Sequence, residues 1–272
     1  VTLFADYEEA INETGLVGYW KLDEGSGTKA YDSSGNGNNA TLMNGPTWVI
    51  GKYRRALSFD GVDDYIEVTE NTDLDPHTNN YTISAWVNIA RLTPTYTDPS
   101  NYGFVITSKR QTSVDYSLTL VAHGGTSETS QAKFAFIWDG PWQAAGAEST
   151  LMDVFGWHHV AGVRRGGQLY VYVDGVEYGP NNFFFTGSHI TPTTDVNSVT
   201  SIHLAHHGAW GQYYNGTIDE VRIYNRALSV QKIGTLAAEC FATHTETITL
   251  GSGASTNVTF IWNTTGFVKG NY

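Results

Sequence analysis

Residues 168–179 read QLYVYVDGVEYG, and this stretch is the clearest indication of the fold in the sequence. Leu169, Val171 and Val173 alternate with two tyrosines, so both faces of a strand here are apolar, because successive side chains point to opposite sides. The Asp-Gly pair at 174–175 predicts a tight hairpin turn into a second strand. Two apolar faces on one strand favour a layered β-sandwich.

The same alternation, or a short apolar run rich in β-formers, recurs from Gly15 to about Leu236 and predicts an all-β protein. Helix signals are few, and the best covers residues 227–236, where Ser229 is a candidate cap. The irregular insertion 91–102 is expected to be a surface loop. The predicted strands lie in GLVGYWKL (15–22), ALSFDG (56–61), DYIEVTE (64–70), YTISAWVNI (81–89), GFVITS (103–108), YSLTLVA (116–122), AKFAFIW (132–138), HHVAGVRR (158–165), QLYVYVDG (168–175), SIHLAHH (201–207) and GTIDEVRIYN (216–225).

Composition narrows the possible partners. The 272 residues carry a formal charge of −12 with only 15% charged residues, against 13% aromatic residues and 29 glycines. An acidic chain is a poor match for nucleic acid or an anionic membrane surface, and no apolar run is long enough to span a bilayer. The single cysteine, Cys240, excludes an intramolecular disulfide.

Five stretches follow one another in a characteristic order: GLVGYWKLDEGSGTKAYDSSGNGNNATL (15–42), ALSFDGVDDYIEV (56–68), YTISAWVN (81–88), GWHHVAGVRRGGQLYVYVDGVEYG (156–179) and GTIDEVRIYNRALS (216–229). In this order they resemble the LamG-like (laminin-G type 3) jelly-roll domains of the concanavalin A-like lectin/glucanase superfamily. The resemblance spans roughly residues 15–236. It implies a two-sheet antiparallel jelly-roll sandwich.

The ends of the chain differ from this core. We expect an N-terminal arm over residues 1–14, the sandwich domain over 15–239, and a β-strand tail over 240–272 with strands near 245–250 and 256–262. The tail resembles the opening of an adhesion-related immunoglobulin-like repeat found in secreted prokaryotic surface proteins. Thirty-three residues cannot close a sandwich, so the tail is expected to be truncated, docked on the main domain, or paired with another chain.

Oxygen-rich loops suggest calcium, a hard cation that takes carboxylate, amide and carbonyl oxygens. The loop DSSGNGN (32–38) and the turn FDGVDD (59–64) are rich in such donors. The family resemblance implies that they meet the last sandwich strand near an edge, often with calcium present. The alternative is ordinary turn chemistry, in which Asp and Asn side chains bond their own backbone. The expected ligands are Asp32, Asn36, Asp60 and Asp219.

Aromatic residues in predicted loops are candidates for ligand contact, because an exposed ring offers a platform for the apolar face of a sugar. The alternative is that the rings cover the ends of the sandwich. Histidines of the stretch IHLAHHGAWGQYY, among them His206 and His207, could instead converge on a metal, whereas the His-His pair at 158–159 is expected to be structural. The candidate sugar-binding residues are Trp142, Trp210, Tyr213 and Tyr214.

Catalytic motifs are missing from the sequence. No glutamate has an aspartate two places on, so the carboxylate pair by which concanavalin A-like glucanases cleave glycosidic bonds is absent. There is also no Gly-x-Ser-x-Gly elbow, His-Glu-x-x-His or phosphate loop. We therefore expect a protein that is not an enzyme.

N-glycosylation sequons are numerous, which favours a secreted glycoprotein in an extracellular or cell-surface location. The sequence supports two functions. The first is a calcium-stabilised surface module that binds glycans or proteins in adhesion; the alternative is a structural subunit of an extracellular filament or surface layer, assembled by β-strand addition through the tail. The sequon asparagines are Asn12, Asn39, Asn80, Asn215, Asn257 and Asn263.

Overall fold

The computed structural model describes most of the sandwich and part of the tail. The predicted loop at 91–102 lies outside the described residues. The described residues are 13–75, 80–90, 104–111, 116–123, 131–140, 143–180, 183–184, 201–207, 212–238, 241–249 and 255–263.

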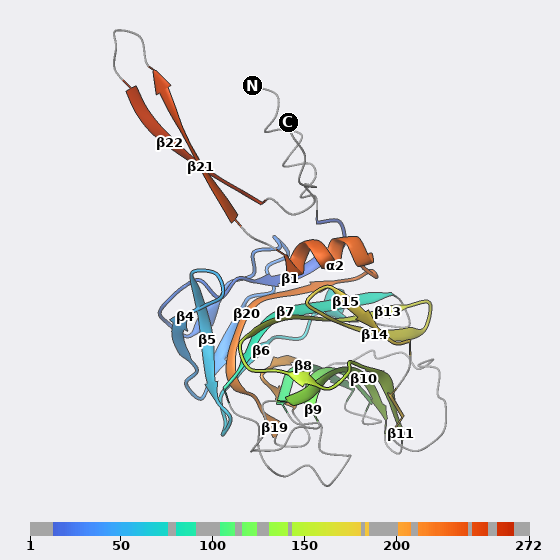
Figure 1. The fold of residues 1–272 in the computed structure, drawn as a ribbon. Helices are drawn as coiled ribbons and strands as arrows, with labels where there is room; N and C mark the ends of the chain where they lie inside the picture. Colours follow the sequence, from blue (N-terminus) through green and yellow to red (C-terminus); the bar gives the residue numbers. More distant parts are fainter. Residues whose placement is uncertain are drawn as a thin grey trace.

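Two antiparallel sheets stack face to face and confirm the predicted all-β jelly-roll sandwich (Figure 1). The first is eight-stranded and runs β15-β14-β13-β7-β20-β5-β4, with β1 also paired to β20. Its strands are β1 (Leu16–Trp20), β4 (Thr47–Ile50), β5 (Arg55–Asp60), β7 (Tyr81–Ile89), β13 (Trp157–Arg165), β14 (Gln168–Val173), β15 (Val176–Tyr178) and β20 (Asn215–Tyr224).

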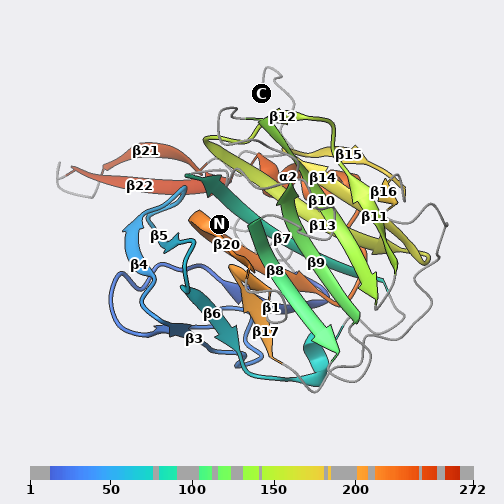
Figure 2. The ribbon, with the colours of Figure 1, turned by 90° about the horizontal axis from the view of Figure 1, so that it is seen from below.

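The second sheet is ten-stranded and runs β16-β11-β10-β9-β8-β17-β6-β3-β2, with β12 paired to β10. Seen from below, β3, β6, β17 and β8 lie side by side across it (Figure 2). Its strands are β2 (Lys29–Ala30), β3 (Ala40–Met43), β6 (Tyr65–Val68), β8 (Phe104–Gln111), β9 (Tyr116–His123), β10 (Gln131–Gly140), β11 (Gln143–Glu148), β12 (Met152–Asp153), β16 (Phe183–Phe184) and β17 (Ile202–Leu204).

The predicted hairpin at 174–175 is confirmed, since Val173 pairs with Val176 across it. Both turn residues have positive φ, +50° for Asp174 and +83° for Gly175, the conformation that Asp-Gly turns of this length adopt. The apolar residues that alternate with tyrosines along β14 enter the main core between the sheets. The two faces of β14 therefore line different layers of the protein, as the sequence predicts.

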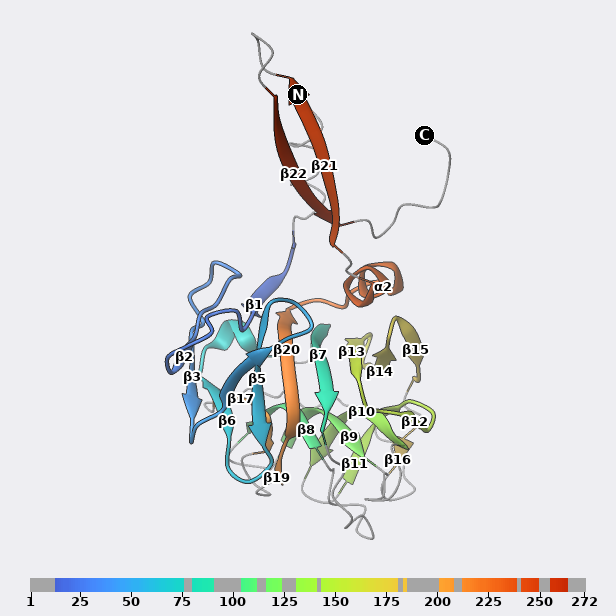
Figure 3. The same cartoon turned by 60° about the vertical axis from the view of Figure 1, so that its left-hand side comes forward.

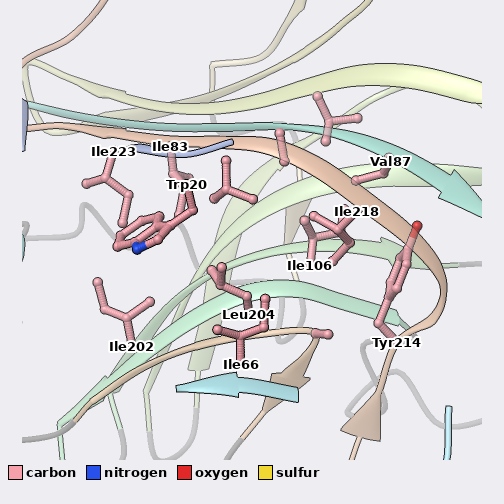
Figure 4. Close-up of a cluster of buried hydrophobic side chains, with 14 of the residues drawn as sticks. Trp20, Ile66, Ile83, Val87, Ile106, Ile202, Leu204, Tyr214, Ile218 and Ile223 are labelled. Atoms are coloured by element: carbon pink, nitrogen blue, oxygen red, sulfur yellow. The ribbon is translucent and has the colours of Figure 1, made fainter. Parts of the chain in front are cut away.

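The main core fills the space between the sheets, with apolar residues from both (Figure 4). Trp20 is fully buried there, and its indole Nε1 donates to the carbonyl of Asn38 at 2.8 Å. The hydrogen bond satisfies the one polar atom of a ring that is otherwise packed in apolar surroundings. The strand β1 and the loop after β2 are thereby fixed to each other.

A second, smaller core lies on the outer face of the eight-stranded sheet, beneath helix α2 (Val230–Ala237). The helix lies where the sequence predicts one, and the Ser229 side chain caps it by accepting from the Lys232 amide at 3.1 Å. Its buried residues Ile233 and Leu236 face Tyr170 and Tyr172 of β14. A 3-10 helix, η1 (Thr72–Leu74), follows β6.

Two further sheets have two strands each. One joins β18 (His206–His207) to β19 (Gln212–Tyr213), just after β17. The other is a ribbon of β21 (Phe241–Thr249) and β22 (Ser255–Asn263), paired over all nine positions of each strand. The ribbon lies beyond α2 (Figure 3), and within the described part of the chain its strands pair only with each other.

Candidate functional site

Four aromatic side chains gather on the outer face of the ten-stranded sheet. Tyr65 begins β6 and His203 is the middle residue of β17, while His206 and Tyr213 pair across β18 and β19. In β6 and β17 the adjacent residues are in the main core, so the alternation turns Tyr65 and His203 outward. We call Tyr65, His203, His206 and Tyr213 the aromatic patch.

The rings of the aromatic patch stack in a continuous series. His206 lies flat on Tyr213, with ring centroids 4.4 Å apart and an interplanar angle of 8°. His203 stacks on the same histidine at 5.1 Å and 29°. Tyr65 closes the group at 5.3 Å from His203 and 5.0 Å from His206. His206 is only 8% exposed and the other three residues of the patch are half-buried.

Burial keeps both histidines of the patch uncharged at neutral pH. It lowers the pKa of His206 to about 4, helped by the neighbouring His203. Burial also lowers the pKa of His203, although the carboxylate of Glu67 opposes this shift. That carboxylate accepts a hydrogen bond from the Ser201 hydroxyl at 2.8 Å. Neutral stacked rings suit contact with another apolar surface, and within the described chain no third metal-ligating side chain joins the two histidines.

An acidic turn between β5 and β6 adjoins the aromatic patch. Carboxylate oxygens of Asp60, Asp63 and Asp64 lie within 4.8 Å of one another. Asp64 immediately precedes Tyr65 and is buried; burial raises its pKa, and the two other carboxylates raise it further. On the other side, the Asn215 amide donates to the Asp60 carbonyl at 2.7 Å, two residues beyond Tyr213. The turn is thus tied to both tyrosines.

The four residues expected to bind calcium do not come together. Asp60 belongs to the acidic turn, but Asp32 and Asp219 are in no described group of three ligating side chains. Both carboxylate oxygens of Asp32 accept hydrogen bonds from its own loop, including the amides of Ser34 and Asn38 at 2.8 and 2.9 Å. The Asn36 amide donates to the Ser34 hydroxyl at 3.0 Å. In this loop, the side chains carry out the turn chemistry that was the alternative.

Asp219 is fully buried in β20. One of its oxygens accepts from the Tyr53 amide at 3.0 Å, in the turn between β4 and β5. A side chain at Gly51 would place its Cβ 2.6 Å from that oxygen, so glycine is required for this close approach. Burial raises the pKa of Asp219 to about 8, and Glu220 adds to the rise. Asp219 therefore holds a proton at neutral pH and braces the turn.

A polar hollow of about 450 Å³ opens beyond the end of β6, on the side of η1. Amide, hydroxyl and carboxylate groups line it, supplied by the loop before β3 and by the segment that follows β6. Such a volume is within the range of small-molecule sites. The lining residues are Gly37, Asn38, Asn39, Thr69, Glu70, Asn71 and Thr72.

The four aromatic residues expected to contact sugar lie in different places. Tyr213 is part of the aromatic patch, and Trp142 and Trp210 lie outside the described residues. The prediction that Tyr214 is a surface residue is wrong, because its ring is fully buried in the main core beside Phe59. Sequence reasoning missed Tyr65, whose position in an alternating strand gave no sign of its long-range neighbours.

The sequon asparagines differ in how far they are exposed to solvent. Asn39 and Asn80 are exposed, and each side-chain oxygen accepts one backbone hydrogen bond, from Asp32 and Gly166 respectively. Asn215 is half-buried, and its amide is the donor to Asp60 described above. The remaining three are Asn12, outside the described residues, and Asn257 and Asn263, of which the structure describes only the backbone in β22.

The comparisons with known proteins agree with the fold. A family model for the concanavalin A-like lectin/glucanases superfamily, of the laminin-G type 3 kind, matches residues 60–234. The match does not reach the tail, so the immunoglobulin-like resemblance stays a prediction. A comparison with curated proteins finds no match.

Solved structures with the same fold come from binding and enzyme chains. Domain 4 of AbnA, a GH43 extracellular arabinanase of Geobacillus stearothermophilus solved with arabinotriose, aligns with a TM-score of 0.55 at 22% identity, over 82% of this chain and 98% of that domain. The botulinum neurotoxin serotype G binding domain gives 0.54 at 14% identity, over 82% of this chain and 50% of that one. Trypanosoma rangeli sialidase, solved with the inhibitor DANA, gives 0.51 at 18% identity, over 82% of this chain and 32% of that one.

These similarities correct one prediction. The sequence led us to expect a protein that is not an enzyme, but the same fold occurs in the structures of an arabinanase domain and of a sialidase. Missing one glucanase motif therefore does not separate this chain from enzymes. Among the described residues, no helix is long and apolar enough to cross a membrane.

Proposed function

Because the chain belongs to the concanavalin A-like lectin/glucanases superfamily, we propose that it binds carbohydrate through the aromatic patch. The single observation that carries the proposal is the stack of Tyr65, His203, His206 and Tyr213 on an outer sheet face. The rings offer apolar surface to the C–H groups of a sugar. Glu67, which pairs with His203 across β6 and β17, adds a carboxylate acceptor for sugar hydroxyls beside the rings.

The fold neighbours support the same reading. Domain 4 of AbnA was solved in complex with arabinotriose, and this chain spans 98% of that domain. We extend the proposal to an adhesion module that works outside the cell on glycans or cell-surface proteins. The exposed sequon residues Asn39 and Asn80 are compatible with that location.

We also propose that the acidic turn of Asp60, Asp63 and Asp64 binds calcium. Carboxylates within 4.8 Å of one another at Asp60, Asp63 and Asp64 are the donor type that calcium takes, whereas the oxygens of Asp32 are already used within their loop. An ion that binds only the folded state raises the melting temperature. We expect a higher melting temperature in millimolar calcium than in EDTA, and identical melts would remove calcium from the account.

Removal of one ring tests the sugar site. We expect Tyr213→Ala to weaken binding at least about tenfold, because loss of a stacked aromatic contact and its buried area costs about 1.4 kcal/mol or more. The measurement is isothermal titration calorimetry with oligosaccharides of the arabinan, cellulose, xylan, mannan and galactan series. Tyr31→Ala is the matched control, since Tyr31 is 58% exposed and outside the patch.

Two results would contradict the proposal. The first is that no oligosaccharide binds the unmodified protein. The second is that Tyr213→Ala and Tyr31→Ala bind equally well. A melting curve of each variant shows that it is folded, and Tyr213→Phe, which keeps the ring, should bind like the unmodified protein.

A second candidate function rests on the ribbon of β21 and β22. Within the described chain these two strands pair only with each other, so each keeps one unpaired edge. Unpaired edges are templates for strand addition from another chain. This arrangement favours a structural subunit of an extracellular filament or surface layer, in which the ribbon joins neighbouring copies.

A further inference from the structure

We infer that the ligand of the proposed site is an oligosaccharide chain that lies along β6 and contacts both the aromatic patch and the polar hollow. The inference rests on the proposed function and adds the length and direction of the ligand. It follows from the position of the two contacts at opposite ends of one strand.

The two contacts lie at the two ends of β6. Tyr65 begins β6, and Thr69, which lines the hollow, directly follows its last residue. Residues 65, 67 and 69 share one face because side chains alternate, and Ile66 and Val68 between them are buried in the core. Four residues of strand separate the two positions by about 13 Å. A single sugar ring is too short to touch both.

The hollow is held in shape by hydrogen bonds in its floor. Asn38 is only 6% exposed, and its amide donates to the Val17 carbonyl at 2.7 Å. The Asn71 amide donates to the Asn38 side-chain oxygen at 2.6 Å, while the Asn71 oxygen accepts from the Asp73 amide at 3.0 Å. These contacts fix both side chains before a ligand arrives, and preorganisation lowers the entropy cost of binding.

Polar groups continue between the two ends. Glu67 lies between Tyr65 and Thr69 on the outer face, and it pairs with Thr41 of β3 on one side and with His203 of β17 on the other. Thr41, Glu67 and His203 are all partly exposed. A chain lying along β6 therefore meets ring surface at one end, then hydroxyl and carboxylate groups, and then the hollow. Sugar rings linked in series present the matching alternation of C–H faces and hydroxyl groups.

Two measurements test the inference: how affinity depends on the length of the oligosaccharide, and how it changes when one residue of the polar hollow is replaced. The probes are the mono- to hexasaccharides of the arabinan, cellulose, xylan, mannan and galactan series, measured by calorimetry. Affinity should rise with length and then reach a plateau. Glu70→Ala removes the carboxylate that lines the hollow and should weaken binding of the longest ligand at least about fivefold. It should leave the shortest ligand that binds unaffected.

The control is Asp153→Ala, which removes an exposed carboxylate from β12, at the other end of the sheet. The inference is overturned if short and long oligosaccharides bind equally, or if Glu70→Ala and Asp153→Ala give the same affinity for the longest ligand. Failure of the proposed function looks different. In that case either no series binds, or Tyr213→Ala leaves the affinity for every length unchanged, and the inference falls with it.

Discussion

At the level of single residues, burial has a larger effect than neighbouring charges on the pKa values of the two histidines in the aromatic patch. The histidines of the aromatic patch would be partly charged at neutral pH in water, but burial lowers their pKa values, that of His206 to about 4. Two neutral imidazole rings stack on each other and on Tyr213 without electrostatic repulsion. Charged imidazolium rings in the same place would repel each other.

Asp219 gives a prediction about pH. Burial raises its pKa in the folded state to about 8, from a usual value of 3.8. Between these two values the folded protein holds a proton that the unfolded chain has released, so a rise in pH removes stability, by at most about 1.4 kcal/mol per pH unit. We expect the melting temperature to fall between pH 6 and pH 8.5, and Asp219→Asn to reduce that fall.

The asparagine variant keeps an oxygen for the Tyr53 amide and stays neutral at every pH. Other groups that titrate, such as His158 beside Asp174, contribute equally to both proteins. Parallel melting curves for Asp219→Asn and the unmodified protein across this range would show that Asp219 is already ionised in the folded state.

Only part of the site could be predicted from the sequence. Tyr213 was expected at the surface because it lies in a predicted loop, but Tyr65 looked like any residue of an alternating strand. Tyr65 and His203 are far apart in sequence and meet only because β6 pairs with β17. The loop around Asp32 shows the converse, since its oxygen-rich composition serves local hydrogen bonds. Composition reveals donor types, and pairing decides which donors meet.

At the level of elements, the contact between the sheets depends on a missing side chain. A Cβ at Gly162 of β13 would lie 2.2 Å from Cδ2 of Phe136 in β10, which is fully buried. We expect Gly162→Ala to destabilise the fold by about 1–3 kcal/mol through overpacking. Thermal or urea unfolding measures the change.

Gly234→Ala is the matched control, because Gly234 lies inside α2 and its Cβ would meet nothing within 4 Å. Alanine is the better helix former by about 1 kcal/mol, so this variant should be as stable as the unmodified protein or more so. Equal stability of Gly162→Ala and the unmodified protein would mean that the sheets are less closely packed than described.

Many strands follow from alternation, whereas β11 does not. Each of the eleven stretches between residues 15 and 236 in which the sequence predicts a strand contains one. The sequence did not predict β11, whose residues QAAGAE are poor β-formers. That segment becomes a strand because it pairs with β10 over six positions. The local sequence of β11 therefore gives little indication of the strand.

At the level of the whole molecule, the second candidate function concerns the ribbon. If it joins neighbouring copies, the full chain should self-associate and a chain that stops at residue 239 should stay monomeric, because the free strand edges are gone. Sedimentation velocity of the two proteins at equal concentration measures this. Identical sedimentation would remove the ribbon as a joint and leave the carbohydrate proposal unaffected.

The most direct test of the central claim is to observe the aromatic patch while sugar binds. The chain has nine histidines, whose ring protons can be followed by NMR during titration with the oligosaccharide that binds most tightly. We predict that the ring signals of His203 and His206 shift and saturate with the calorimetric affinity, while those of His158 and His159, in the other sheet, do not move. Saturable binding without any shift at His203 and His206 would contradict the account.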